Sequence, residues 1–181
     1  MPQICVPLAN GFEEIEAISI IDICRRAQIQ VIVAGVDGIY AQGAQNISIE
    51  TDCLIDTVDV NTLDMLVLPG GLAGTQILSE HPLVQSLLKQ MQQAGKHIGA
   101  ICAAPYALHR ANVLSEDFTC YPGIEDKIAG ANRQDRAVVI NNKVITSQGV
   151  GTALCFALEI VKLLQGEKTY QQIKQAVLAQ C

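Results

Sequence analysis

Several features that define whole classes of protein are missing from this chain. Tryptophan is absent and aromatic residues make up 4% of the sequence, so a folded core has to be built from aliphatic side chains. No apolar run approaches the roughly 18 residues that a membrane-spanning helix needs. The segment Met1–Val6 also lacks the basic region and apolar stretch of a signal peptide. We therefore expect no membrane association and no leader.

Runs of basic residues are missing as well. The formal net charge is −6, and no cluster of lysine and arginine stands out along the chain. A basic patch is the electrostatic signature of proteins that bind nucleic acids or anionic membranes. We therefore do not expect nucleic acid among the partners.

The seven cysteines lack the spacing of a metal site or a disulfide framework. Their number is odd, and no C-x-x-C pair occurs, so zinc and thioredoxin-type chemistry have no sequence support. Cys5, Cys24, Cys53, Cys120 and Cys155 lie in apolar or regular segments, where a free cysteine packs as a small hydrophobic residue. We expect reduced cysteines, a cytoplasmic location and no metal.

What the sequence does contain is the alternating pattern of an α/β domain. At 181 residues, half of them hydrophobic and 17% charged, the chain suits one domain, residues 1–181, with a sizeable core. Short runs rich in Ile, Val and Leu alternate with segments of helical spacing. This alternation predicts a doubly wound, mainly parallel sheet sandwiched between helices.

The same pattern gives approximate bounds. Strands are predicted at Gln3–Leu8, Gln30–Ala34, Asp64–Pro69, Lys96–Ile101, Phe118–Cys120, Ala137–Ile140 and Lys143–Ser147. Helices are predicted at Glu13–Ala27, Pro82–Ala94, Pro105–Ala111, Thr152–Leu164 and Lys168–Ala179, and a hairpin at residues 37–51. Because such sheets place their sites beyond the carboxyl ends of the strands, we expect four turns to meet at one edge. These turns follow Leu8, Pro69, Ile101 and Ser147.

Cys102 stands where a buried strand turns into a helix. The stretch Lys96–Pro105 begins as an apolar run, ends in small residues, and has a proline where a first helical turn accepts it. This is the arrangement of a nucleophile elbow, which presents a side chain at the carboxyl end of a strand. The amide dipoles of the following helix favour a thiolate, so we expect a lowered pKa for Cys102 and assign the chemistry to it.

Glu16 is the second candidate, because of the helix face it occupies. With 3.6 residues per turn it shares a row with Ile20 and Ile23, so it points toward the core. A carboxyl group there is costly unless it is protonated or hydrogen-bonded, and its pKa is expected to be raised. Beside a Cys102 thiolate it would form an acid–base pair. The same spacing also suits a glutamate at the edge of a helix face.

The glycine-rich stretch Gly70–Gly74 follows a predicted strand. It lacks the G-x-G-x-x-G spacing and the Lys-Ser/Thr of nucleotide-binding loops, so nucleotide binding has weak support. Its glycines would let the backbone approach a ligand and direct an N–H at an oxyanion. A tight strand-to-helix turn explains the same residues equally well.

No histidine is placed as a partner for Cys102. His97 opens the elbow strand at the end away from the cysteine, and His81 precedes a predicted helix. His109 lies seven residues beyond the cysteine, about 10 Å along a helix. Because histidine is the usual partner of a nucleophilic cysteine, its absence argues against a cysteine protease.

Four stretches stand in the order and spacing of a known family: Gly11–Glu16, Leu68–Gly71, Ala100–Pro105 and Thr146–Thr152. They resemble the DJ-1/ThiJ/PfpI superfamily, and in particular the branch that contains YajL and the parkinsonism-associated deglycase. The similarity covers nearly the whole chain. It implies a flavodoxin-like α/β sandwich that forms homodimers and needs no cofactor.

The resemblance also implies roles for individual residues. Cys102 would be the reactive cysteine, hydrogen-bonded to a protonated Glu16. Backbone amides near Gly71 and Ala103, together with Gly70, would form an oxyanion and substrate-binding site.

One position departs from the family pattern. Many relatives carry a His-Pro pair near the site, and Tyr121-Pro122 stands here, as an aromatic residue does in YajL-like members. The change removes an imidazole and argues against protease or amidase activity. We place Tyr121, Pro122 and Ser147 in the layer around the reactive pair. Ser147–Gly149 also does not match the His-x-Glu of glutamine amidotransferases, which share the fold.

Two functions are implied. The first is an enzyme of glyoxalase or deglycase type, acting on small α-oxoaldehydes or glycated substrates under carbonyl or oxidative stress. In it Cys102 adds to the aldehyde and Glu16 moves the proton. The alternative is a non-enzymatic redox sensor or chaperone that acts through oxidation of Cys102.

Overall fold

The computed structural model describes residues 1–130 and 132–181, and a seven-stranded sheet runs through its centre. The strand order is β10-β11-β7-β6-β1-β2-β5, and every pair is parallel except β10 with β11. The bounds are β1 Gln3–Leu8, β2 Gln30–Gly35, β5 Cys53–Leu54, β6 Met65–Leu68, β7 His97–Ile101, β10 Val138–Asn141 and β11 Val144–Ser147. The predicted mainly parallel sheet is confirmed, and β11, β7, β6 and β1 lie side by side at its centre.

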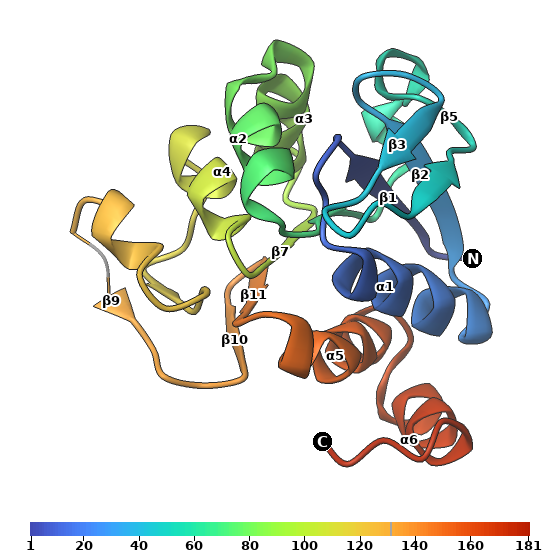
Figure 1. Ribbon diagram of the computed structural model, residues 1–181. Coiled ribbons are helices and arrows are strands. Elements are labelled where there is room, and N and C mark those ends of the chain that lie inside the picture. The colour runs from blue at the N-terminus through green and yellow to red at the C-terminus, as the bar shows by residue number, and fades with distance from the viewer. Residues whose placement is uncertain (131) are drawn as a thin grey trace.

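Helices cover both faces of the sheet. In Figure 1, α1, α5 and α6 lie below it, while α2, α3 and α4, in green and yellow, lie above. The bounds are α1 Glu14–Arg26, α2 Leu72–Glu80, α3 Pro82–Gln93, α4 Pro105–Arg110, α5 Ala153–Gln165 and α6 Glu167–Ala176. The sequence pattern predicts all of these except α2, which the glycine-rich stretch leaves open. In the described part of the chain, no helix combines the length and apolarity needed to cross a membrane.

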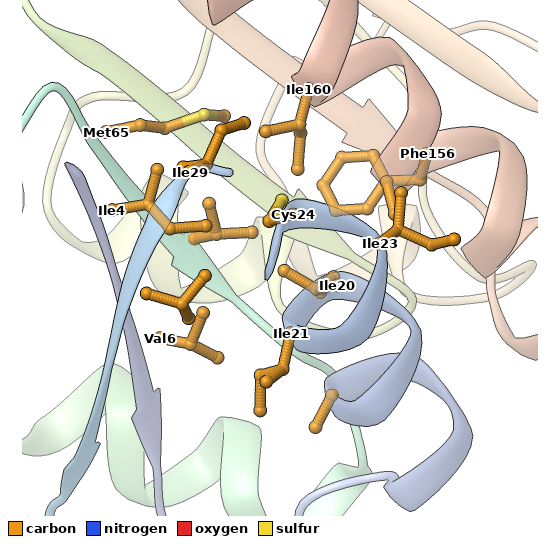
Figure 2. Close-up of a cluster of buried hydrophobic side chains, with 14 of the residues drawn as sticks. Ile4, Val6, Ile20, Ile21, Ile23, Cys24, Ile29, Met65, Phe156 and Ile160 are labelled. Carbon is orange, nitrogen blue, oxygen red and sulfur yellow. The ribbon is translucent and has the colours of Figure 1, made fainter. Parts of the chain in front are cut away.

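The two faces of the central strands pack into separate cores. Along β1, Ile4 and Val6 point toward α1 and α5, whereas Cys5 points toward α2, α3 and α4. Figure 2 shows the first of these cores, in which Ile20 of α1 lies near Phe156 of α5. Each fully buried aliphatic or phenyl side chain contributes about 1.5–3 kcal/mol. The first core therefore holds α1, and with it Glu16, firmly against the sheet.

Two small sheets lie outside the main one. β3 Tyr40–Gln42 and β4 Ser48–Glu50 form the predicted antiparallel hairpin. β8 Asp117–Phe118 pairs with β9 Asn132–Arg133, so the strand predicted at Phe118–Cys120 is shorter and does not join the main sheet. Short 3-10 helices span Ile55–Thr57, Val60–Thr62, Glu125–Lys127 and Val150–Thr152.

The expectation of reduced cysteines is wrong for one pair. Cys155, near the start of α5, forms a disulfide with Cys181, 26 residues later, with the two Cα atoms 5.5 Å apart. Beyond α6 the chain returns toward α5, so the pairing depends on tertiary structure that residue spacing does not reveal. It also removes the cysteine argument for a reducing compartment. The free cysteines are Cys5, Cys24, Cys53, Cys102 and Cys120.

Candidate active site

Cys102 follows directly on β7 and takes a strained backbone conformation. Its φ of +63° lies in the left-handed region, which a residue with a side chain adopts when its surroundings hold it there. The Cys102 N–H donates to the carbonyl oxygen of Ser147 (3.0 Å), and the Cys102 carbonyl accepts from the N–H of Tyr121 (2.9 Å). Helix α4 begins at Pro105. The sharp strand-to-helix turn predicted at this cysteine is confirmed.

Glu16 lies against Cys102 from helix α1. Its side chain is fully buried beside Cys102. Its Oε2 atom also accepts from the N–H of Gly70 at 2.8 Å. Its Oε1 atom is buried without a hydrogen-bond partner among the described residues. Ile20 and Ile23 on the same helical row are buried too, so the period of the helix predicts the direction of Glu16 correctly.

Burial dominates the protonation of this pair. It raises the pKa of Glu16 to about 7, against the hydrogen bonds from Gly70 and Cys102, which favour the carboxylate. It also raises the pKa of Cys102 to about 12, with the nearby Glu16 carboxylate as the second cause, while the N–H groups of Gly71 and Ala103 oppose the rise. The expected lowering of the Cys102 pKa is therefore wrong. The amides ahead of α4, a helix of only six residues, are outweighed by burial and by the carboxylate.

Glu16 lies close enough to Cys102 to act on its proton, because a Cβ added to Gly70 would overlap both side chains. With pKa values of about 7 and about 12, Glu16 loses its proton first, and Cys102 stays a thiol near neutral pH. The carboxylate can accept the thiol proton as the sulfur reacts. The pair can therefore supply a sulfur nucleophile without a histidine.

Gly70 and Gly71 allow the backbone to pass this close to the pair. A Cβ on Gly70 would lie 2.5 Å from the Cβ of Cys102 and 2.6 Å from Oε2 of Glu16. Gly71 has a φ of +91°, and a Cβ there would overlap the backbone of Gly11. We expected Gly70 at the oxyanion site, but its N–H donates to Glu16 instead. The N–H groups that oppose the rise in the Cys102 pKa are those of Gly71 and Ala103.

A cavity of about 830 Å³ opens over Cys102. The turns after β1, β6, β7 and β11 all contribute to it, as the fold prediction requires. Its lining residues are Gly11, Glu13, Ala44, Gly71, Leu72, Ala73, Cys102, Ala103, Tyr121, Pro122, Gln148, Gly149, Val150, Gly151 and Thr152. Most of these are small or apolar. Glu13 is the only lining residue with a charged side chain.

The three residues that we expected in the layer around Cys102 and Glu16 occupy different positions. Tyr121 and Pro122 line the cavity itself. Ser147 is fully buried behind it, where its Oγ donates to the carbonyl of Ala137 (2.7 Å) and shares a hydrogen bond with the hydroxyl of Thr152 (2.7 Å). Ser147 therefore fixes the turn after β11, and Tyr121 and Pro122 can meet a ligand directly.

Ten of the lining residues were not predicted as site residues, and four of these are Glu13, Leu72, Gln148 and Val150. Each stands beside or within a family motif, which is the signal that would have pointed to them. The sequence alone does not show that these side chains face one cavity, because that depends on how the turns are arranged in the fold.

None of the three histidines is among the lining residues. His97 begins β7 at the end away from Cys102, His109 lies on α4, and His81 precedes α3. No histidine therefore lines the cavity beside Cys102. Within residues 1–130 and 132–181, no group of three His, Cys, Asp or Glu side chains is arranged to hold a metal ion.

The fold and the site together define a class. A mainly parallel α/β sandwich with a cysteine on a strand-to-helix elbow, beside a buried glutamic acid from the first helix, has a flavodoxin-like fold. The sequence matches the model of the DJ-1/PfpI family over residues 2–163. The chain belongs to the DJ-1/PfpI family.

Relatives match over most of the chain. It is 39% identical over 170 residues to "Glutathione-independent glyoxalase DJR-1.2" of Caenorhabditis elegans, a match covering 92% of this chain and 91% of the relative. It is 34% identical over 180 residues to "Protein DJ-1 homolog B" of Arabidopsis thaliana, covering 98% of this chain but 41% of the relative, so it spans less than half of that protein. The crystal structure of Drosophila melanogaster DJ-1beta matches with a TM-score of 0.95 at 36% identity, covering 99% of both chains.

Proposed function

We propose that this protein is a cofactor-independent glyoxalase, which converts 2-oxoaldehydes such as methylglyoxal to 2-hydroxy acids and so relieves carbonyl stress. The observation that carries the proposal is the Cys102–Glu16 pair in contact at the base of an open cavity. One group is a nucleophile and the other a proton carrier with a pKa of about 7, close to the value that suits acid–base catalysis at neutral pH. The name of the C. elegans relative supports the same activity.

The reaction begins with addition of sulfur to the aldehyde carbon. The Sγ atom of Cys102 forms a C–S bond, and the electron pair of the C=O double bond moves to the oxygen, which takes a proton. The N–H groups of Gly71 and Ala103, already directed at the sulfur, stabilise the charge that develops on this oxygen.

Glu16 then moves a proton between the two substrate carbons. The former aldehyde carbon gives up its proton to the carboxylate, an enediol forms, and the neighbouring carbon receives a proton. The aldehyde carbon is thereby oxidised by two electrons and the ketone carbon reduced by two, so no external oxidant is consumed. Water hydrolyses the resulting thioester: the C–S bond breaks, the hydroxy acid leaves, and the sulfur regains its proton.

The test is production of lactate from methylglyoxal without glutathione. Wild-type protein is expected to form lactate, and Cys102→Ser to lose about 100-fold or more of that rate, because the nucleophile is gone. Cys53→Ser is the matched control, since Cys53 is a free thiol outside the cavity lining. Absence of lactate from the wild type, or full activity in Cys102→Ser, would contradict the proposal.

Oxidation sensing by Cys102 is a second proposal that one observation favours. Cys102 lines the cavity, whereas Cys5, Cys24 and Cys120 are buried free thiols. A peroxide that enters the cavity meets Cys102 and would oxidise it to sulfenate and then sulfinate. Glu16, when protonated, can donate a hydrogen bond to a sulfinate oxygen. After mild peroxide, peptide mass spectrometry should find two oxygens on Cys102 first, and equal oxidation of all free cysteines would exclude this role.

A further inference from the structure

The cavity is larger than a three-carbon aldehyde requires. Its volume of about 830 Å³ is in the range of roughly 300–1,000 Å³ that is typical of sites for drug-sized ligands. We propose that the site selects uncharged 2-oxoaldehydes that carry an aryl or branched alkyl group, in preference to methylglyoxal. In this proposal, which rests on the glyoxalase function above, Leu72, Tyr121 and Val150 determine the preference.

Three large apolar side chains surround the opening. Leu72 is 70% exposed, Tyr121 55% and Val150 41%, and all three line the cavity. They come from three separate parts of the fold, namely the first turn of α2, the loop after β8 and the 3-10 helix after β11. Exposed apolar side chains that gather around a hollow mark a binding site for an apolar group. An apolar substituent next to the reacting aldehyde would cover all three.

Tyr121 is held beside the nucleophile by its backbone. Its N–H donates to the carbonyl of Cys102 (2.9 Å), and its ring passes over Gly149, where an added Cβ would lie 3.4 Å from Cδ2. The ring therefore has a defined position on the cavity wall although it is half exposed. Edge-to-face or offset contact with an aryl group adds to simple burial.

The charge of the site excludes anionic substrates. Glu13 is the only lining residue with a formal charge, and Glu16 adds a second carboxyl group beneath the sulfur. No lysine, arginine or histidine is among the lining residues. A substrate carboxylate or phosphate would therefore lose water without gaining a cationic partner. The favoured substituent is uncharged as well as apolar.

Phenylglyoxal is a probe that meets these requirements. The reaction is the one above with a phenyl group in place of the methyl: addition of Cys102 to the aldehyde, proton movement between the two carbons by Glu16, and hydrolysis to mandelate. The same two electrons move from the aldehyde carbon to the ketone carbon. The phenyl group takes no part in the bond changes, but its conjugation with the ketone alters the intrinsic reactivity, so the loss of preference in the Leu72 and Tyr121 variants is what reports binding.

The first measurement compares kcat/KM for phenylglyoxal and methylglyoxal. We expect a ratio of about 10 or more in the wild type, as for a hydrophobic pocket that recognises a larger substituent. Leu72→Ser and Tyr121→Ser should each lower the ratio. Leu83→Ser is the control, because Leu83 is 44% exposed on α3 and does not line the cavity. Lactate formation with a ratio of one or less would overturn this proposal and leave the glyoxalase function standing.

The second measurement does not depend on turnover. Phenacyl bromide, iodoacetamide and iodoacetate alkylate Cys102 by forming a C–S bond as the halide leaves, and each rate is divided by that of N-acetylcysteine. We expect phenacyl bromide to be favoured about tenfold over iodoacetamide, and iodoacetate to be the slowest. This order without any aldehyde turnover would refute the glyoxalase function but support apolar selection. Equal normalised rates for the three reagents would overturn the selection itself.

Discussion

At the scale of single residues, the buried carboxyl group of Glu16 lowers the stability of the fold and is also the proposed proton carrier. Its carboxyl group is fully buried, and one of its two oxygens has no partner among the described residues. A carboxyl group in this setting prefers to stay protonated, which is the reason for its pKa of about 7. The same raised pKa makes Glu16 a proton carrier at neutral pH.

The destabilising effect of the buried Glu16 carboxylate should appear in the pH dependence of the free energy of unfolding. A carboxyl group with a pKa raised from 4.5 to about 7 favours folding below pH 4.5 and loses that contribution as the pH rises through 7. Glu16→Gln does not titrate, so the variant should gain about 3 kcal/mol over the wild type between pH 4.5 and pH 8. Urea unfolding of both proteins at the two pH values measures this gain. A constant difference between them would contradict the raised pKa.

The direction of Glu16 could be predicted from sequence, but the direction of the Cys102 pKa could not. The helical period depends on neighbours three and four residues away, which the sequence displays. The pKa of Cys102 depends on burial, on the carboxyl group of Glu16 and on the amides of Gly71 and Ala103. These groups come from α1, the turn after β6 and the elbow, and their distances exist only in the fold.

At the scale of elements, the disulfide between Cys155 and Cys181 ties the end of the chain to α5. The pair closes a loop across a separation of 26 residues, which restricts the unfolded chain and stabilises the fold by about 3 kcal/mol. Cys181→Ser should lower the urea midpoint accordingly, and a reductant should lower the wild type to the same level. Cys53→Ser serves as the control. A wild-type midpoint that neither reductant nor Cys181→Ser changes would show that the bond contributes nothing.

Most of the helices and strands could be predicted from the sequence. Runs such as Gln3–Leu8 and Asp64–Pro69 are apolar after their first residue, as strands buried on both faces must be. Helix α2 could not be predicted, because its residues include a glycine and follow a glycine-rich turn that also fits a loop. The disulfide could not be predicted either, because Cys181 meets Cys155 only when the chain returns toward α5 beyond α6 in the folded protein.

At the scale of the whole molecule, one group of exposed apolar side chains is not part of the cavity lining. Ile15 and Ile18 of α1 are 55% and 46% exposed, and Ile47 of the hairpin loop is 56% exposed. Glu14 holds that loop against α1, because its Oε1 atom accepts from the N–H groups of Gln45 (2.6 Å) and Ile47 (3.4 Å). We propose that two copies of the chain associate through this surface.

Ile18→Glu should break this association, because it places a charge in an apolar interface. Light scattering after size-exclusion chromatography should give twice the chain mass of 19.4 kDa for the wild type and 19.4 kDa for the variant. Leu83→Glu, on the exposed face of α3, should remain dimeric. A monomeric wild type, or a dimer that survives Ile18→Glu, would refute this interface.

The most direct test of the account is the pH profile of Cys102 alkylation by iodoacetamide, followed by peptide mass spectrometry. The rate should rise with a midpoint of about pH 7, where Glu16 becomes a carboxylate that can take the thiol proton as the sulfur reacts. In Glu16→Gln this step should be lost, because the thiol then has no base beside it and burial keeps its own pKa raised. A wild-type midpoint at the ordinary thiol value of about 8.5, unchanged in Glu16→Gln, would show that Glu16 does not act on the thiol proton.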